Sequence, residues 1–90
     1  MGHTANYGQV SVTTSAVQVL DRTADLRDRV VLTNHSTTDI YISNSDDVSS
    51  NNGILMPGVA GYQLILYNRD PIWAIAASGT VKLGYCEEVK

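Results

Sequence analysis

The sequence predicts an all-β fold, an antiparallel sandwich of about eight short strands with a jelly-roll-like arrangement. Three observations lead to this prediction. Runs of β-branched residues recur at intervals of about ten residues, turn-forming residues separate them, and no segment carries a sustained helical period. A chain of 90 residues is long enough for one such domain with a thin core.

The first two expected strands show strict alternation of apolar and polar residues. Val10 and Val12 alternate with polar neighbours in residues 9–12, and valines again stand two apart in residues 16–20. This alternation is typical of a strand with one buried and one solvated face. The remaining expected strands cover residues 29–33, 40–42, 54–56, 62–67, 72–77 and 81–86.

The segments between these strands set the expected organisation. The Asn/Ser/Thr-rich segment 34–39 predicts a hairpin joining strands 29–33 and 40–42. The charged stretch 21–28 and the polar segment 44–53 predict the two long loops. Because the first residues carry no pattern, we expect a flexible N-terminal arm over residues 1–8 and a single β-sandwich domain over residues 9–90.

Composition narrows the possible functions. Cys86 is the one cysteine, so neither an intrachain disulfide nor a cysteine cluster for zinc can form. No N-terminal run is apolar enough for a signal peptide or a membrane span, so we expect a soluble protein with no membrane partner. The net charge is −3 and the basic residues are scattered, so no nucleic-acid partner is expected. Charged residues make up 17 % of the chain, against about 25 % in an ordinary domain. This low charge favours a protein whose surface contacts other protein chains.

Residues with reactive side chains do not form a catalytic pattern. His35, Ser36 and Asp39 are crowded into one turn, where such residues usually hydrogen-bond to the backbone, whereas a catalytic triad needs convergent side chains on a rigid frame. Cys86 lies beside two acidic residues, which disfavour the thiolate. We therefore expect no enzyme activity, no catalytic residues and no cofactor.

The oxygen-rich segment 44–52 offers ligands for a weak calcium site. Its spacing matches no EF-hand, which needs acids at alternate positions and a closing Glu. We favour a solvated loop and assign no metal site.

Several stretches resemble a known family. In residues 29–43 an apolar strand runs into an Asn/Ser/Thr turn and then into Ile40-Tyr41-Ile42, a pattern similar to that of small structural proteins of tailed bacteriophages. Gly53-Ile54 followed by Pro57-Gly58, and residues 73–80 leading into a last valine strand, extend the similarity over residues 9–88. The resemblance implies a virion component of the capsid decoration (cement), head-fibre base or tail accessory type, without a cofactor and often trimeric.

The leading hypothesis is a cement protein at the virion capsid surface, made in the host bacterial cytoplasm. Its expected partners are the outer surface of the major capsid protein shell and further copies of itself in a homotrimer. Removal of residues 1–7 is expected to weaken capsid binding and to leave the melting temperature unchanged. The candidate partner-binding residues lie in the arm, on one strand and in the two long loops: Tyr7, Arg27, Tyr41, Asp46, Asp47, Asn51 and Asn52.

Two alternatives remain open. The first is a phage tail or head-fibre adhesion module that binds host-surface glycans, with exposed Tyr or Trp side chains beside the 44–52 loop as its site. The second is a tail or baseplate structural subunit, which copy number alone would distinguish from a cement protein.

Overall fold

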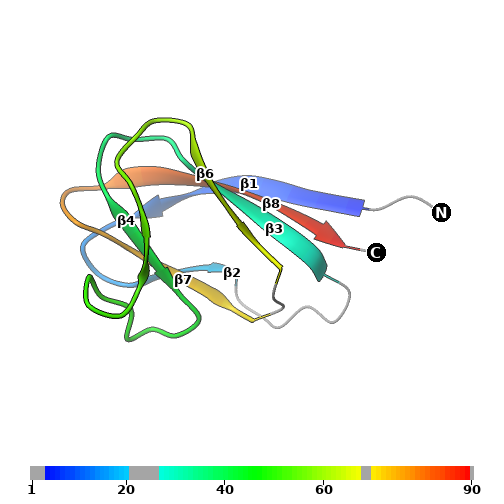
Figure 1. Cartoon of the computed structure of the whole chain (residues 1–90), viewed down its shortest axis with the longest axis horizontal. Helices are drawn as coiled ribbons and strands as arrows, with labels where there is room; N and C mark the ends of the chain where they lie inside the picture. The colour runs from blue at the N-terminus through cyan, green and yellow to red at the C-terminus, as the bar shows by residue number, and fades with distance from the viewer. Residues whose placement is uncertain (1–3, 21–26, 68–69, 90) are drawn as a thin grey trace.

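The computed structural model describes residues 4–20, 27–67 and 70–89, and in them it confirms the predicted all-β sandwich (Figure 1). These residues form two antiparallel sheets of four strands each. The first sheet has the order β1-β8-β3-β6, and the second has the order β2-β7-β4-β5. The strands are β1 (Thr4–Val12), β2 (Val17–Leu20), β3 (Arg27–Asn34), β4 (Ile40–Ser43), β5 (Ile54–Met56), β6 (Tyr62–Leu66), β7 (Ile72–Ala76) and β8 (Val81–Val89).

The strand order is that of a jelly roll. Along the chain, β1 pairs with β8, β2 with β7, β3 with β6 and β4 with β5, so the pairs nest inside one another. A nested set arises when one long hairpin folds over on itself, and this arrangement divides eight strands between two sheets. The two described ends of the chain lie side by side, because Thr4 pairs with Val89 (Figure 1).

The core fills the space between the sheets with side chains from alternate positions. In β3, Val30 and Leu32 are fully buried, and in β4 Ile40 and Ile42 face them from the second sheet. The intervening residues of each strand point outward, as the period of two in a strand requires. The buried hydrophobic cluster consists of aliphatic side chains and one methionine: Val12, Val19, Val30, Leu32, Ile40, Ile42, Met56, Ile72, Ala74, Ala76 and Leu83.

The predicted hairpin between strands 29–33 and 40–42 is wrong. β3 and β4 lie in different sheets, and residues 35–39 carry the chain from one sheet to the other. β3 is paired on both sides, by β8 and β6, and β4 is paired by β7 and β5. Turn composition predicted a change of direction correctly, but strand pairing depends on distant segments that turn chemistry does not specify.

Asn34 holds this crossing in place. Its side chain is fully buried, and its amide nitrogen donates to the backbone oxygens of Thr38 at 2.9 Å and Pro57 at 3.0 Å. Its oxygen accepts from the backbone nitrogen and the hydroxyl of Ser36 at 2.9 and 2.7 Å. Asn34 therefore joins the β3–β4 connection to the β5–β6 connection.

Asp39 and Gly58 make a second link between the same two connections. The Asp39 Oδ1 atom accepts a hydrogen bond from the Gly58 backbone nitrogen at 2.7 Å. A Cβ atom at position 58 would collide with the backbone of Thr37, so only glycine allows this approach. Close packing of the two connections thus explains why glycine follows Pro57 in the sequence.

The predicted flexible arm is wrong for residues 4–8, which belong to β1. They pair one to one with residues 85–89 of β8. Backbone hydrogen bonding to a long partner strand orders them although their sequence carries no apolar alternation. Residues 1–3 of the predicted arm lie outside the described residues.

Deletion of residues 1–7 should therefore destabilise the domain, contrary to the expectation from sequence. It removes the part of β1 that pairs with the end of β8. It also removes the Asn6 side-chain amide, whose nitrogen lies 3.4 Å from the buried Glu87 carboxylate. We expect a loss of at least about 1 kcal/mol and a fall of about 4–8 °C in the melting temperature, measured by circular dichroism.

Tyr7→Ala is the control for this deletion. It keeps the β1 backbone and removes a side chain that is 77 % exposed, so its melting temperature should stay close to that of the parent. An unchanged melting temperature after the deletion would contradict the pairing of β1 with β8.

Candidate functional site

The outer face of the β1-β8-β3-β6 sheet carries an apolar row across all four strands. Tyr7 stands opposite Cys86, Cys86 opposite Val31, and Val31 opposite Ile65. Tyr7 and Ile65 at the ends of the row are 77 % and 42 % exposed, and the two central residues are half-buried. We call these four residues the apolar row; they offer a contact surface that the core does not use.

A polar row lies next to the apolar row and contains a hollow. It consists of Gln9, Gly84, Thr33 and Gln63, again one residue from each strand. His35 lies against Gly84, and a Cβ atom at position 84 would come within 2.6 Å of the His35 Nε2 atom. An open depression of about 300 Å³ lies here, bounded by His35 and by residues of both rows.

On the other side of the apolar row lies an ion pair. The Arg29 guanidinium donates to the Glu88 carboxylate at 3.0 Å, and both side chains are partly exposed. This hydrogen bond and the charge of Glu88 raise the pKa of Arg29 further above its usual value, and a hydrogen bond with Tyr67 acts in the same direction. Tyr67 itself is 72 % exposed beside the end of β6.

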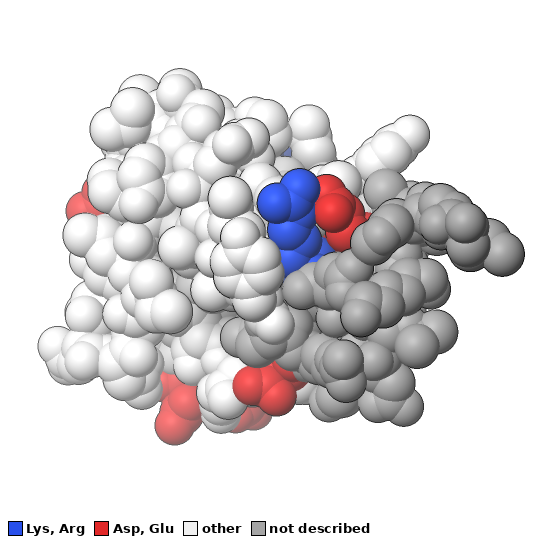
Figure 2. Space-filling model, turned by 45° about the vertical axis from the view of Figure 1, so that its right-hand side comes forward, with Lys and Arg blue, Asp and Glu red and all other residues white. Residues whose placement is uncertain are grey.

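Among the described residues on the face seen in Figure 2, few side chains other than this ion pair are charged. Figure 2 shows a surface on which the described residues are mostly neither acidic nor basic, with a basic group beside an acidic one. This face therefore offers few charged groups among the residues that the structure describes.

The outer face of the second sheet is covered in part by the 44–53 loop. Val48 in this loop is buried although it lies outside the main core cluster, and a Cβ atom at Gly53 would touch both Val48 and the Cβ of Tyr41. The Asn52 side chain closes the loop: it accepts from the Ser49 backbone nitrogen at 2.8 Å and donates to the Asp47 backbone oxygen at 3.0 Å. The 44–53 loop is thus held by its own hydrogen bonds and covers the part of the second sheet around Tyr41.

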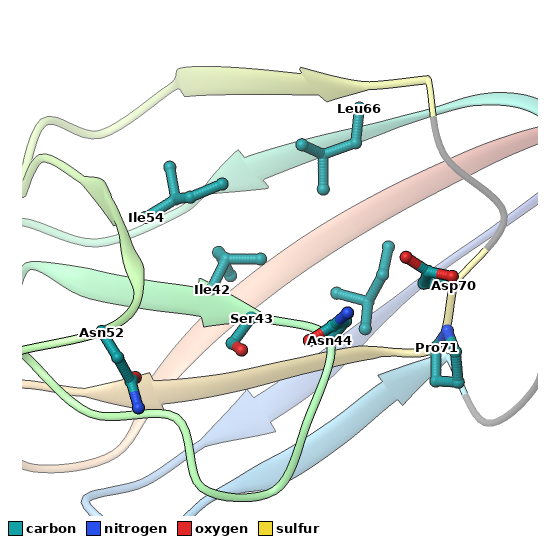
Figure 3. Close-up of a pocket in the computed structure, with 9 residues that line it drawn as sticks. Ile42, Ser43, Asn44, Asn52, Ile54, Leu66, Asp70 and Pro71 are labelled. Atoms are coloured by element: carbon teal, nitrogen blue, oxygen red, sulfur yellow. The ribbon is translucent and has the colours of Figure 1, made fainter.

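A cavity of about 240 Å³ opens at one end of the sandwich, between the two sheets (Figure 3). Its floor is formed by core-facing side chains such as Ile42 and Leu66. Its rim is polar, with Asn44 and Asp70 on one side and Asn52 on the other (Figure 3). The cavity thus combines an apolar floor with a few polar groups at its rim.

The structure divides the predicted partner-binding residues between two faces. Tyr41 lies half-buried on the outer face of the second sheet, against the loop that bears Asp46, Asp47, Asn51 and Asn52. Tyr7 lies on the outer face of the first sheet, on the other side of the sandwich. The backbone of Arg27 belongs to β3, but its side chain lies outside the described residues.

Sequence reasoning did not find the apolar row. In β6 both alternating sets contain apolar residues, Leu64 and Leu66 in one and Ile65 in the other, so the pattern does not show which set is buried. The row also depends on cross-strand register, which brings together residues up to 79 positions apart, as between Tyr7 and Cys86 (86 − 7 = 79).

The three residues considered for catalysis have separate surroundings. The Ser36 hydroxyl donates to the Asn34 side chain, Asp39 accepts from Gly58, and His35 lies against Gly84 on the outer face of the first sheet. Within the described ranges no group of three or more His, Cys, Asp or Glu residues is arranged to hold a metal ion. In the same ranges no helix has the length and apolarity to cross a membrane.

Comparison with known proteins shows the fold. No protein-family model matches the sequence, and no curated protein matches it. A cupin-2 domain-containing protein from Shewanella frigidimarina is similar in structure, with a TM-score of 0.59, 16 % identity, and coverage of 92 % of this chain and 69 % of that one.

Two further similar structures are a phage spike domain and a pilus. The stem and receptor-binding domain of the spike protein P1 of bacteriophage PM2 has a TM-score of 0.55 and 19 % identity over 84 % of this chain, which spans 30 % of that one. A disulfide-linked pilus of Bacillus endospore appendages has a TM-score of 0.55 and 10 % identity, covering 99 % of this chain and 87 % of the other. At these identities the shared property is the β fold.

Proposed function

We propose that this chain is a virion structural protein, a capsid decoration (cement) protein that binds the outer surface of the major capsid protein shell and stabilises it. The observation that carries the proposal is the apolar row with the neighbouring Tyr67, which gathers apolar and aromatic side chains on one outer face of the sandwich. Exposed apolar patches on small soluble domains mark interfaces with other proteins. In this proposed role the protein is not an enzyme and uses no cofactor.

The fold and composition support a structural role. A jelly roll of this size presents two flat outer faces on a rigid frame, and one face is free of the loop that covers the other. The structural neighbours include a phage spike domain and a spore appendage. A protein that binds only the assembled shell stabilises that shell by mass action.

The test is binding to capsid shells that lack this protein. The double variant Ile65→Ala/Tyr67→Ala removes two exposed side chains from the outer face, and we expect its affinity for shells to fall at least about tenfold in co-sedimentation. Both side chains point away from the core, so the melting temperature should change little.

Val59→Ala is the matched control, because Val59 is 59 % exposed and lies outside the strands, in the connection between β5 and β6. It should bind shells as the parent does. Equal binding by the parent and the β6 double variant would refute this face as the contact. A copy number in virions far below that of the major capsid protein would refute decoration and favour a tail or baseplate subunit.

The end cavity supports a second candidate, an adhesion module that binds host-surface glycans. Asn44 and Asp70 on its rim could hydrogen-bond to sugar hydroxyls above the apolar floor. Glycan-array binding that is lost in Asn44→Ala would support this candidate. Absence of any sugar-dependent melting shift would count against it.

A further inference from the structure

The structure has one long open strand edge, along β1. β1 ends the first sheet, and nothing in the described part of the chain pairs with its outer side. The strand is nine residues long and pairs with β8 in an uninterrupted one-to-one register, without a bulge. Unpaired backbone groups along such an edge are a template for pairing with another strand.

β1 also lacks the features that normally block such pairing. Proteins protect exposed edges with charged residues, prolines, bulges or short strands. The sequence of β1, TANYGQVSV, contains no charged residue and no proline. Its outward-facing side chains Tyr7 and Gln9 are exposed.

Two of the other three sheet edges carry such protections, and the third is much shorter than β1. β2 has four residues and an irregular register between Gln18 and Leu20. β5 has three residues and is followed directly by Pro57. β6 carries no charge, proline or register shift of its own, but with five residues it is little more than half as long as β1. The contrast singles out β1 as the edge suited to association.

We propose that two copies of this chain associate through β1, antiparallel about a two-fold axis, to form one continuous eight-stranded sheet with the order β6-β3-β8-β1-β1-β8-β3-β6. A second copy is the favoured occupant because an edge strand is complementary to itself under a two-fold rotation. Since β1 is uncharged, its self-pairing brings no like charges together. The apolar rows of the two copies then lie on one shared face.

The register of the pairing follows from the two faces of the strand. Residues Val10 and Val12 face the core and Tyr7 and Gln9 face outward, so pairing must bring outward residues opposite outward residues. An axis through Gly8 places Tyr7 of one copy opposite Gln9 of the other and uses the whole strand. Axes through residues 7 or 9 place these residues opposite their own counterparts.

The double variant Tyr7→Lys/Gln9→Lys tests this interface in any of these registers, because each places lysine opposite lysine. We expect the parent to be a dimer by light scattering after size exclusion, and the variant to dissociate with a dissociation constant at least about tenfold higher. Both side chains are exposed, so the melting temperature of the monomeric domain should be retained, as checked by circular dichroism.

The matched control is Gln63→Lys/Ile65→Lys, which makes the same kind of change on the outer face of the opposite edge strand, β6. It should remain a dimer. Amide hydrogen exchange gives a second readout: in the parent, amides on the open side of β1 should become protected as protein concentration rises, and those of β6 should not.

A parent that stays monomeric up to millimolar concentration would overturn the inference. So would a dimer or trimer without protection in β1, or one that the β1 variant leaves intact. The inference does not rest on the proposed function: dimer formation is measured on the isolated protein, whereas capsid binding is tested with β6 variants and shells.

Discussion

Asn34→Ala should lower the free energy of unfolding by about 3 kcal/mol. The Asn34 side chain is fully buried and takes part in four hydrogen bonds, which reach Ser36, Thr38 and Pro57. Alanine leaves the Pro57 carbonyl oxygen and the Ser36 backbone nitrogen without this partner, and the Thr38 oxygen keeps only the Ser36 hydroxyl at 3.3 Å. An unmade buried hydrogen bond costs more than a typical bond contributes.

The expected loss is a large share of the total. A domain of this length has a free energy of unfolding of roughly 5–13 kcal/mol, so urea denaturation should show a clearly lower midpoint with an unchanged slope. Amides in residues 35–39 and 57–61 should also exchange faster, because Asn34 links these two connections.

Asn52→Ala is the matched control. The Asn52 side chain also makes two hydrogen bonds to the backbone, but it is exposed in the 44–53 loop, where water can replace them. Its loss should cost about 1 kcal/mol or less. Similar losses for the two variants would mean that Asn34 does not hold the crossing between the sheets.

Leu32→Ala should lower the free energy of unfolding by about 3–5 kcal/mol, measured by the same denaturation. Leu32 is fully buried in the centre of β3, between Tyr85 of β8 and Leu64 of β6 on the same sheet. The substitution removes apolar contacts and leaves a cavity. The two hydrogen-bonded sheets can close this cavity only in part, so the lost contacts are not regained.

Ile65→Ala is the control on the neighbouring strand. Ile65 is 42 % exposed on the outer face, so its truncation should cost less than about 1 kcal/mol. The comparison tests which side of β6 is buried. If Ile65→Ala were as costly as Leu32→Ala, the assigned register of β3 and β6 would be incorrect.

Much of the fold could be predicted from local patterns. The positions of all eight strands were predicted to within a few residues, except that β1 begins at Thr4 and β3 and β8 are longer than expected. Alternation in segments such as Ile40-Tyr41-Ile42 and Val10-Ser11-Val12 showed correctly which side chains face the core. This works because the two-residue period of a strand is a local property.

Pairing between strands could not be predicted in the same way. The hairpin expected between β3 and β4 followed from an Asn/Ser/Thr turn, yet the same residue types here support a crossing between sheets, with Asn34 buried at its centre. A turn sequence specifies that the chain changes direction. Which strand then lies alongside depends on the burial of residues far away in the sequence.

The candidate site also depends partly on local sequence patterns and partly on long-range strand pairing. Tyr7 and Tyr41 were chosen from sequence as exposed aromatic residues, and Tyr7 is indeed exposed, whereas Tyr41 is half-buried against the 44–53 loop. The apolar row that joins Tyr7 to Ile65 exists only because β8 and β3 lie between β1 and β6. Local alternation, turn residues and composition were enough to establish an all-β sandwich from this sequence. The surfaces of that sandwich arise from long-range strand order, because backbone hydrogen bonding is indifferent to sequence and only the combined burial of all eight strands selects one arrangement.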